Sequence, residues 1–435
     1  MGNYETVMKR TEEFRKDRFG LFIHWGLYSV AARHEWVKST ERLTNADYQR
    51  YFDSFTAENY EPKKWAKLAK AAGMKYAVLT TKHHEGFCLF DSEYTDYKAT
   101  NTKAGRDLVR EFVDAFRAEG IKIGFYYSLL DWHHPDYPHY GDEHHPQRDN
   151  PEYSNEGRDF SRYIEYMHNQ VRELVTNYGK IDIMWFDFSY ADMKGERWEA
   201  TKLVKMIREH QPGIIIDNRL VGAGSDAGRG VDIDNAPIYS GDFFSPEQFI
   251  PKCGLTDVNG RPIPWEACMT TQADSWGYVS GNDVFMSARE VIYTLVDCVS
   301  KNGNLLLNVG PTAKGEFPKR TVELLREVGE WMRENGESIY GCYAVDAPAP
   351  EWGRLTRSDE AIYAHFFDKS GYCMSIEGVS RDSVDYALYL DDLSEIKLGD
   401  FWNRGAIGES VAVPFAKSAG LKNPIDTVVK LVLKK

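Results

Sequence analysis

The segment from Trp185 to Ser189 holds the residue best suited to do chemistry, the carboxylate Asp187. It follows the apolar run at residues 181–184, which is typical of a buried parallel strand. Burying a carboxylate costs free energy unless a partner pairs with it, and barrel enzymes place such residues at the mouth of the active site. Aromatic residues flank Asp187, and the 435-residue chain holds 11 Trp and 26 Tyr. We therefore hypothesise that Asp187 attacks a sugar.

Other predicted strand ends also carry polar residues that are rare in cores. Any one of them could be a hydrogen-bonded structural residue. Because the carboxyl ends of parallel strands meet at one mouth of a barrel, we expect the whole set to surround one substrate pocket. The set comprises His24, with Glu35 and Trp36 in the next loop, then His83, His84, Tyr126, Tyr127, Asp217, Asn218 and Arg219.

Glycoside cleavage needs a second carboxyl group besides the attacking one. Glu247 and Glu266 are the main candidates, because both lie later in the predicted barrel, and Glu143 and Glu35 are weaker ones. Each late glutamate lies too far along the chain from Asp187 to form a local motif with it. Spacing alone therefore does not choose between Glu247 and Glu266.

The histidines suggest an alternative, a metal-dependent hydrolase, because neutral imidazole is a common metal ligand. Adjacent side chains such as His83 and His84 point to opposite faces of an extended segment, and the sequence contains no HxH or HExxH motif. We therefore expect no catalytic metal and no cofactor. A barrel that binds sugar without cleaving it is a further alternative, since a fold can persist after its chemistry is lost.

Composition and charge argue against several other classes of protein. The net charge of −13 repels phosphate backbones, so nucleic acid is not an expected partner. No apolar run approaches the roughly 20 residues of a membrane helix. The six cysteines form no CxxC pair, which indicates reduced thiols. With no signal peptide in the sequence we expect a cytoplasmic protein, although a secreted or periplasmic protein whose signal was removed would read the same.

Predicted strands and helices alternate along most of the chain. Apolar runs at 20–25, 76–81, 122–127, 181–187, 214–218, 267–271 and 304–309 read as strands, and helical periodicity separates several of them. This rhythm indicates a parallel sheet covered by helices, and the number of units favours an irregular (β/α)8-like barrel. No GxGxxG motif follows the first strand, which argues against a dinucleotide-binding fold. The less regular segment 189–285 predicts a distorted later half.

The alternation of predicted strands and helices ends near Gly341. A Pro-rich stretch at 347–350 reads as a linker, and short alternating runs follow it. We predict a catalytic barrel over residues 1–345 and a C-terminal antiparallel β-sandwich over 346–435.

Several segments resemble the α-L-fucosidases of glycoside hydrolase family 29, in the family's order along the chain. They are RFGLFIHWG (18–26), LTTKHHEGF (79–87), FYYS (125–128), WFD (185–187), NR (218–219), WE (265–266) and SWGY (275–278). The resemblance implies a retaining exo-α-L-fucosidase that acts on terminal fucose of oligosaccharides or glycoconjugates. The substrate is then a fucosylated glycan; the sequence leaves linkage preference and self-association open.

The resemblance also implies roles for individual residues. Asp187 matches the nucleophile, and Glu247 is the preferred acid/base. Glu266 is the second candidate for the acid/base, although its expected role is structural. Trp276 matches an aromatic residue near the methyl group of the sugar. Matches to fucose-binding positions are His24, Glu35, Trp36, His83, His84, Tyr126, Trp185 and Arg219.

Overall fold

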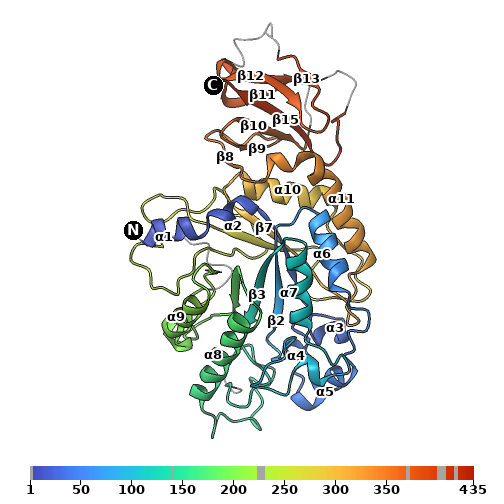
Figure 1. Ribbon diagram of the computed structural model, residues 1–435, viewed down its shortest axis with the longest axis vertical. Helices are drawn as coiled ribbons and strands as arrows, with labels where there is room; N and C mark the ends of the chain where they lie inside the picture. The colour runs from blue at the N-terminus through green and yellow to red at the C-terminus, as the bar shows by residue number, and fades with distance from the viewer. Residues whose placement is uncertain (1–2, 139–141, 223–230, 369–372, 399–407, 416–419) are drawn as a thin grey trace.

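Figure 1 shows the computed structural model of the protein, which describes residues 3–138, 142–222, 231–368, 373–398, 408–415 and 420–435. Seven parallel strands of the described chain form one curled sheet in the order β5-β4-β3-β2-β1-β7-β6. These strands are β1 (Phe19–Ile23), β2 (Tyr76–Lys82), β3 (Lys122–Ser128), β4 (Ile183–Asp187), β5 (Ile215–Ile216), β6 (Glu266–Thr270) and β7 (Asn304–Val309).

Helices cover this sheet, and two short ones precede β1. Their bounds are α1 (Asn3–Arg10), α2 (Glu12–Asp17), α3 (Tyr28–Ala31), α4 (Val37–Thr40), α5 (Asn45–Ser54), α6 (Pro62–Ala71), α7 (Leu108–Ala118), α8 (Phe160–Asn177), α9 (Ala200–His210), α10 (Ala288–Val299) and α11 (Lys319–Asn335). The short 3-10 helices are η1 (Ala99–Asn101), η2 (Gly195–Trp198), η3 (Gly336–Ser338) and η4 (Arg381–Ser383).

The helices begin where the sequence provides caps. In α10 the Ser287 side chain accepts a hydrogen bond from Glu290 N while the Glu290 carboxylate accepts one from Ser287 N, which forms a capping box. In α8 the Asp159 side chain accepts from Ser161 N. Because this cap lies at Asp159, the helix begins at Phe160.

An irregular segment lies between the two edge strands of the parallel sheet. Phe243 forms a parallel bridge with Asp217 just beyond β5, while Phe244 bridges Trp265, and Glu247 bridges Cys268 of β6. Residues 243–247, which we call the closing segment, therefore take the place of a strand between β5 and β6. The prediction of an irregular barrel with a distorted later half is confirmed, since β5 holds two residues where five were expected.

The C-terminal region is antiparallel, as predicted. One sheet has the order β13-β12-β15-β10-β9-β8, and β11 pairs with β14 in a second. An apolar cluster that includes Ile362, Phe366, Ile376 and Val413 draws residues from both sheets. The strands are β8 (Tyr343–Ala344), β9 (Gly353–Arg357), β10 (Ala361–Phe366), β11 (Cys373–Ser380), β12 (Val384–Tyr389), β13 (Glu395–Ile396), β14 (Ser410–Pro414) and β15 (Thr427–Leu433).

Helices α10 and α11 lie between the barrel and the C-terminal sheets (Figure 1). A buried hydrogen bond joins the two parts: Trp331 Nε1 of α11 donates to Asp426 O at 3.2 Å, and the Asp426 carboxylate in turn lies 2.7 Å from His365 Nδ1 of β10. The main apolar core also extends to Tyr363 and Val428 of the C-terminal sheet. The C-terminal region is therefore packed against the barrel through a continuous core.

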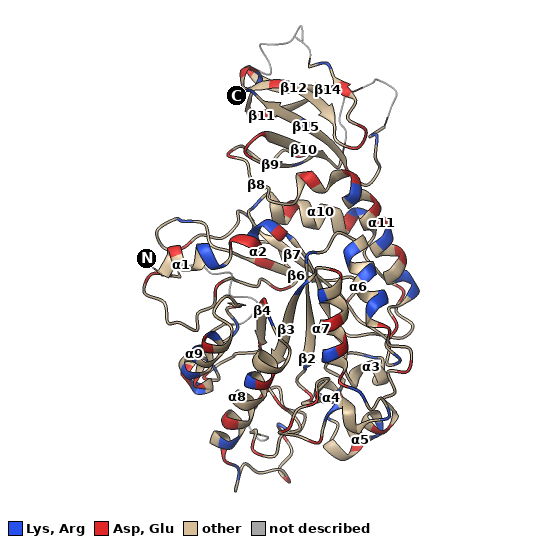
Figure 2. Cartoon of the chain, in the orientation of Figure 1, with Lys and Arg blue, Asp and Glu red and all other residues tan. Residues whose placement is uncertain are grey.

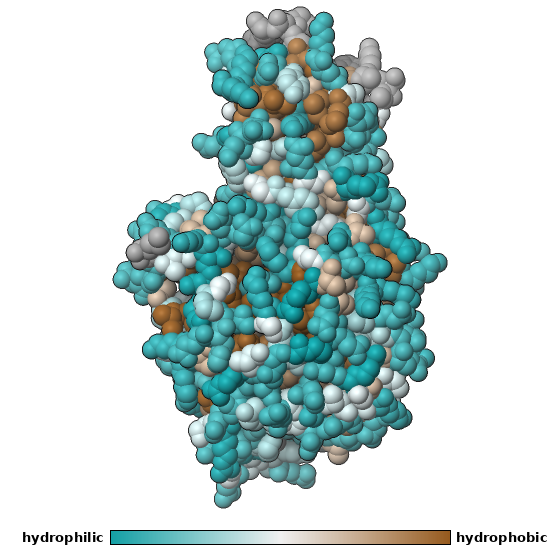
Figure 3. Space-filling model, viewed as in Figure 1, coloured by the Kyte–Doolittle hydropathy of each residue, from teal (hydrophilic) through white to brown (hydrophobic). Residues whose placement is uncertain are grey.

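Charged residues gather on the covering helices, whereas the central strands contain few (Figure 2). The face in Figure 3 is largely hydrophilic, with hydrophobic residues in scattered patches. None of the described helices is long and apolar enough to cross a membrane. All six cysteines are free, and four of them are buried.

Candidate active site

A cavity of about 220 Å³ opens at the carboxyl ends of the barrel strands. Most of the sequence-predicted site residues meet there. Its lining consists of Phe22, His24, Trp36, His83, His84, Tyr126, Trp185, Asp187, Phe188, Glu247, Cys268 and Trp276. We call this cavity the sugar pocket.

Asp187 ends β4 and faces the sugar pocket, with 14% of its side chain exposed. Tyr126 donates its hydroxyl proton to Asp187 Oδ2 at 2.7 Å, and Arg219 Nη1 donates to Oδ1 at 3.1 Å. Burial raises the pKa of Asp187, and the charge of Arg219 opposes that rise. The next residue, Phe188, has a φ of 82°, a left-handed conformation that is strained for an aromatic residue.

Arg219 joins the two predicted catalytic carboxylates. Its Nη1 contacts Asp187, while its Nη2 donates to Glu247 Oε2 at 2.9 Å. Ser245 holds the guanidinium in place, because its hydroxyl and its carbonyl oxygen accept from Nε at 2.8 Å and from Nη2 at 3.1 Å. The carboxyl groups of Asp187 and Glu247 thus lie within the span of one guanidinium group, as a pair acting on one bond requires.

The three predicted histidines lie side by side in the wall of the sugar pocket. The rings of His83 and His84 have centroids 4.0 Å apart, and those of His24 and His83 are 5.7 Å apart. Burial lowers the pKa values of His24 and His84 well below the ordinary histidine value, so both rings are neutral at neutral pH. Asn308 Oδ1 contacts His24 Nδ1 at 2.7 Å, which fixes the ring.

Aromatic rings form much of the remaining wall. Tyr126 and Trp185 are stacked with their centroids 5.7 Å apart, and Trp276 lies 5.1 Å from the ring of His24. The guanidinium carbon of Arg219 lies 4.8 Å from the centroid of Trp185. Such faces suit the apolar C–H surfaces of a sugar, while the polar groups between them can bind hydroxyls.

Glu35 does not line the sugar pocket. Its buried carboxylate instead accepts hydrogen bonds at Oε2 from Ser275 Oγ, Trp276 N and Gly277 N, at 2.9, 3.0 and 3.1 Å. The contacts of Glu35 therefore position the loop that carries Trp276.

The alternative acids lie away from Asp187. Glu266 is fully buried in the barrel interior, where Tyr76 donates a hydrogen bond to its Oε2. Burial raises the pKa of Glu266 to about 8. Glu143 is exposed and contacts His144 Nε2 at 3.2 Å. Neither residue lines the sugar pocket, whereas Glu247 does.

Some residues that shape the site were not singled out from the sequence. Cys268 and Phe188 line the sugar pocket, while Asn308 and Ser128 hold His24 and His84. Asn308 lies near the end of the predicted strand 304–309, so the rule that selected the other strand-end polar residues could have found it. Ser128 also ends a strand, but a serine carries no comparable chemical signal.

In the described part of the chain, no group of three or more His, Cys, Asp or Glu side chains could hold a metal ion. The chemistry of the site rests on its carboxylates, with the arginine, tyrosine and histidines as hydrogen-bonding groups. A pair of carboxyl groups in an aromatic-walled pocket at the strand ends of a parallel barrel is typical of a glycoside hydrolase.

The family model described as Alpha-L-fucosidase matches residues 3–337. Plasma alpha-L-fucosidase of Homo sapiens is 30% identical over 381 residues, which cover 81% of this chain and 75% of the human protein. The chain belongs to the α-L-fucosidases of glycoside hydrolase family 29.

Solved structures agree with this assignment. Alpha-L-fucosidase isoenzyme 1 from Paenibacillus thiaminolyticus has a TM-score of 0.93 and 53% identity, covering 99% of this chain and 100% of that one. A family 29 α-L-fucosidase from Bacteroides thetaiotaomicron has a TM-score of 0.83 and 29% identity, with coverage of 98% and 96%. That protein was described as a trapped covalent intermediate in complex with 2-fluoro-fucosyl fluoride.

Proposed function

We propose that the protein is a retaining exo-α-L-fucosidase that releases terminal fucose from oligosaccharides or glycoconjugates. The observation that carries this proposal is the bridge from Arg219 to Asp187 at 3.1 Å and to Glu247 at 2.9 Å. It brings a nucleophile and an acid to one small pocket. The covalent intermediate described for the Bacteroides relative supports a mechanism of two displacements.

In the first displacement, a carboxylate oxygen of Asp187 attacks the anomeric carbon as the glycosidic bond breaks. Glu247 gives its proton to the leaving oxygen, and a fucosyl ester forms on Asp187. In the second, Glu247 takes a proton from water, the hydroxide oxygen attacks the same carbon, and Asp187 leaves as a carboxylate. Two inversions give net retention.

Tyr126 and Arg219 keep the Asp187 carboxylate in its ionised, oriented form, because both donate hydrogen bonds to it. The neutral rings of His24 and His84 can bind sugar hydroxyls without adding charge. Trp276 and Phe22, with ring centroids 5.9 Å apart, form an apolar corner suited to the methyl group of a 6-deoxy sugar. We infer that this corner favours fucose over galactose.

Two substitutions test the two roles on an aryl α-L-fucoside with a good leaving group and on an alkyl α-L-fucoside with a poor one. Asp187→Ala should lower kcat on both by at least about 10³-fold, and added azide should restore turnover as a β-fucosyl azide. Glu247→Ala should lower kcat/KM about 10²–10⁴-fold on the alkyl substrate and much less on the aryl one. Normal turnover by Asp187→Ala would refute the nucleophile, and equal losses in Glu247→Ala would refute the acid.

A further inference from the structure

A second cavity of about 510 Å³ adjoins the sugar pocket. Trp36 and Trp276 line both cavities, so the two lie side by side. The lining of the second cavity consists of His34, Glu35, Trp36, Thr40, Gln248, Thr270, Asp274, Ser275 and Trp276.

We propose that this second cavity, the outer cavity, binds the sugar to which fucose is attached, a neutral and hydroxyl-rich pyranose. The proposal rests on the fucosidase function and names the leaving-group side of the same site. Glu247 lines the sugar pocket and the next residue, Gln248, lines the outer cavity. Glu247, the acid that protonates the glycosidic oxygen, thus lies at the boundary between the sugar pocket and the outer cavity. The bond to be cleaved must cross this boundary.

Two polar residues of the outer cavity are held in strained backbone conformations. Gln248 has a φ of 59° and Asp274 a φ of 62°, both in the left-handed region. Strain of this kind collects at ligand-binding positions, where the surrounding structure maintains it. Gln248 N donates to Cys268 O at 3.0 Å and its Nε2 donates to Thr270 Oγ1 at 3.2 Å, which fixes this residue beside the acid.

The chemistry of the outer cavity selects its occupant. The amide of Gln248, the carboxylate of Asp274 and the hydroxyl of Thr40 can bind sugar hydroxyls, and the rings of Trp36 and Trp276 can cover its apolar faces. Carboxylates of Asp274 and Glu35 oppose an anionic occupant. The volume is within the range of small-ligand pockets, about 300–1,000 Å³.

The test compares substrates that do and do not reach the outer cavity. The double variant Gln248→Gly/Asp274→Gly removes both side chains, and glycine accepts the left-handed backbone without added strain. We measure kcat/KM on neutral α-L-fucosyl disaccharides and on 4-nitrophenyl α-L-fucoside. The ratio of the best disaccharide value to the aryl value should fall about tenfold or more, as expected when hydrogen bonds worth about 1.4 kcal/mol in total are lost.

Asp283→Gly is the matched control, because Asp283 is exposed in the same loop region and does not line the outer cavity. Its ratio should equal that of the wild type. The proposal is overturned if the double variant keeps the wild-type ratio, or if the wild type cleaves the aryl fucoside but none of the disaccharides. A wild type that cleaves no fucoside would refute the proposed function itself.

Discussion

His84 illustrates how a single hydroxyl can set the chemistry of the sugar pocket. Its Nδ1 lies 2.6 Å from Ser128 Oγ, and that hydroxyl donates to Leu130 O at 2.9 Å and accepts from Leu130 N at 3.1 Å. With the serine proton directed to Leu130, Nδ1 of the neutral ring must be the donor. Its Nε2, 3.7 Å from Asp187 Oδ2, is then an acceptor for a sugar hydroxyl.

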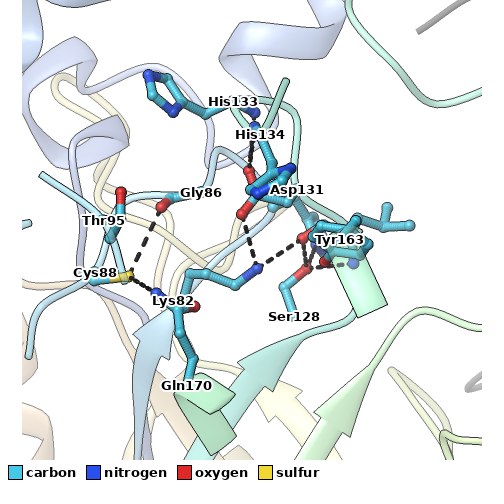
Figure 4. A network of polar contacts seen from close by, with 12 residues as sticks. Lys82, Gly86, Cys88, Thr95, Ser128, Asp131, His133, His134, Tyr163 and Gln170 are labelled. Atoms are coloured by element: carbon cyan, nitrogen blue, oxygen red, sulfur yellow. Dashed lines mark hydrogen bonds and ion pairs between the residues drawn. The ribbon is translucent and has the colours of Figure 1, made fainter. Parts of the chain in front are cut away.

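A buried ion pair between Lys82 and Asp131 lies beside Ser128 and supports this arrangement (Figure 4). Lys82 Nζ donates to Leu130 O at 3.3 Å and contacts Asp131 Oδ2 at 3.1 Å, and neither side chain is more than 2% exposed. Burial raises the pKa of Asp131, but the charge of Lys82 and the neighbouring His134 and His133 outweigh burial and lower that pKa to about 2. The turn at Leu130 that orients Ser128 is therefore fixed by charge.

Ser128→Ala should release the ring of His84 and lower kcat/KM on an aryl fucoside about tenfold, because one hydrogen bond of about 1.4 kcal/mol is lost. Nitrogen-15 NMR of His84 should show a mixture of tautomers in place of the Nδ1–H form. Ser29→Ala is the control, since Ser29 is also buried and its hydroxyl has no hydrogen-bond partner among the described residues. An unchanged tautomer in Ser128→Ala would contradict the argument.

Single residues of the site could be predicted where their type is unusual for a strand end. A carboxylate, histidine or arginine after an apolar run costs desolvation energy, so its presence indicates a use. This reasoning led to His24, His84 and Asp187, which line the sugar pocket, and to Arg219, which contacts Asp187. It could not find Ser128, which is unremarkable in type. Nor could it show that the carboxylate of Glu35 is turned to backbone N–H groups, because that depends on a loop 240 residues away.

At the scale of elements, the closing segment 243–247 carries the acid side of the site. It follows Gly241, whose φ is 85° and whose added Cβ would lie 2.4 Å from Asp217 O. Asp242 then accepts from Ile216 N at 2.9 Å and pairs with Arg208 at 2.8 Å. These contacts bring Ser245 and Glu247 to Arg219. A side chain at position 241 would push the segment away from β5.

Gly241→Ala should therefore reduce activity and stability together. The left-handed backbone and the clash with Asp217 O should cost about 1–3 kcal/mol in the free energy of unfolding, measured by urea denaturation. We expect kcat/KM to fall about tenfold or more, because Glu247 moves with the segment. Gly213→Ala serves as the control, since no atom lies within 4 Å of its added Cβ and its φ is not left-handed. Equal effects of the two changes would contradict this role.

The regular elements were predictable and the closing segment was not. Strands β1, β2, β3, β4 and β7 are buried along nearly their whole length, so each has an apolar run that the sequence displays. The closing segment makes isolated bridges to two neighbours and contains Ser245, Pro246 and Glu247. Because polar contacts to Arg219 rather than apolar burial place Ser245 and Glu247, periodicity gives no sign of these two residues.

At the scale of the whole molecule, the interior of the barrel contains the carboxylic acid Glu266 in place of an apolar side chain. Glu266 has no exposed surface and accepts from Tyr76, whose hydroxyl also contacts Asn304 Nδ2 at 3.4 Å. Tyr76 belongs to an apolar cluster that also includes Phe14, Trp185 and Leu306. Burial raises the pKa of Glu266 from 4.5 to about 8, so at neutral pH the folded protein holds a proton on Glu266 that the unfolded chain has released.

This proton makes stability depend on pH in a definite direction. Between pH 4.5 and about 8 the folded state binds more protons at Glu266 than the unfolded state does, so the free energy of unfolding falls as pH rises. Histidines act in the opposite sense: burial lowers the pKa values of His24 and His84, so their contribution is lost as pH falls below 6.5. The wild type and a variant that lacks only the Glu266 carboxyl group share these histidines. The difference between their free energies of unfolding therefore isolates the contribution of Glu266.

Glu266→Gln keeps the shape of the side chain and cannot ionise, and its amide can accept and donate hydrogen bonds as the protonated acid does. Its free energy of unfolding, relative to the wild type, should therefore rise by about 3 kcal/mol between about pH 5.5 and about pH 8.5. Urea denaturation at several pH values measures the difference, and Glu330→Gln, exposed on α11, should show no such rise. Parallel curves for Glu266→Gln and the wild type would mean that the central acid is already ionised in the folded barrel.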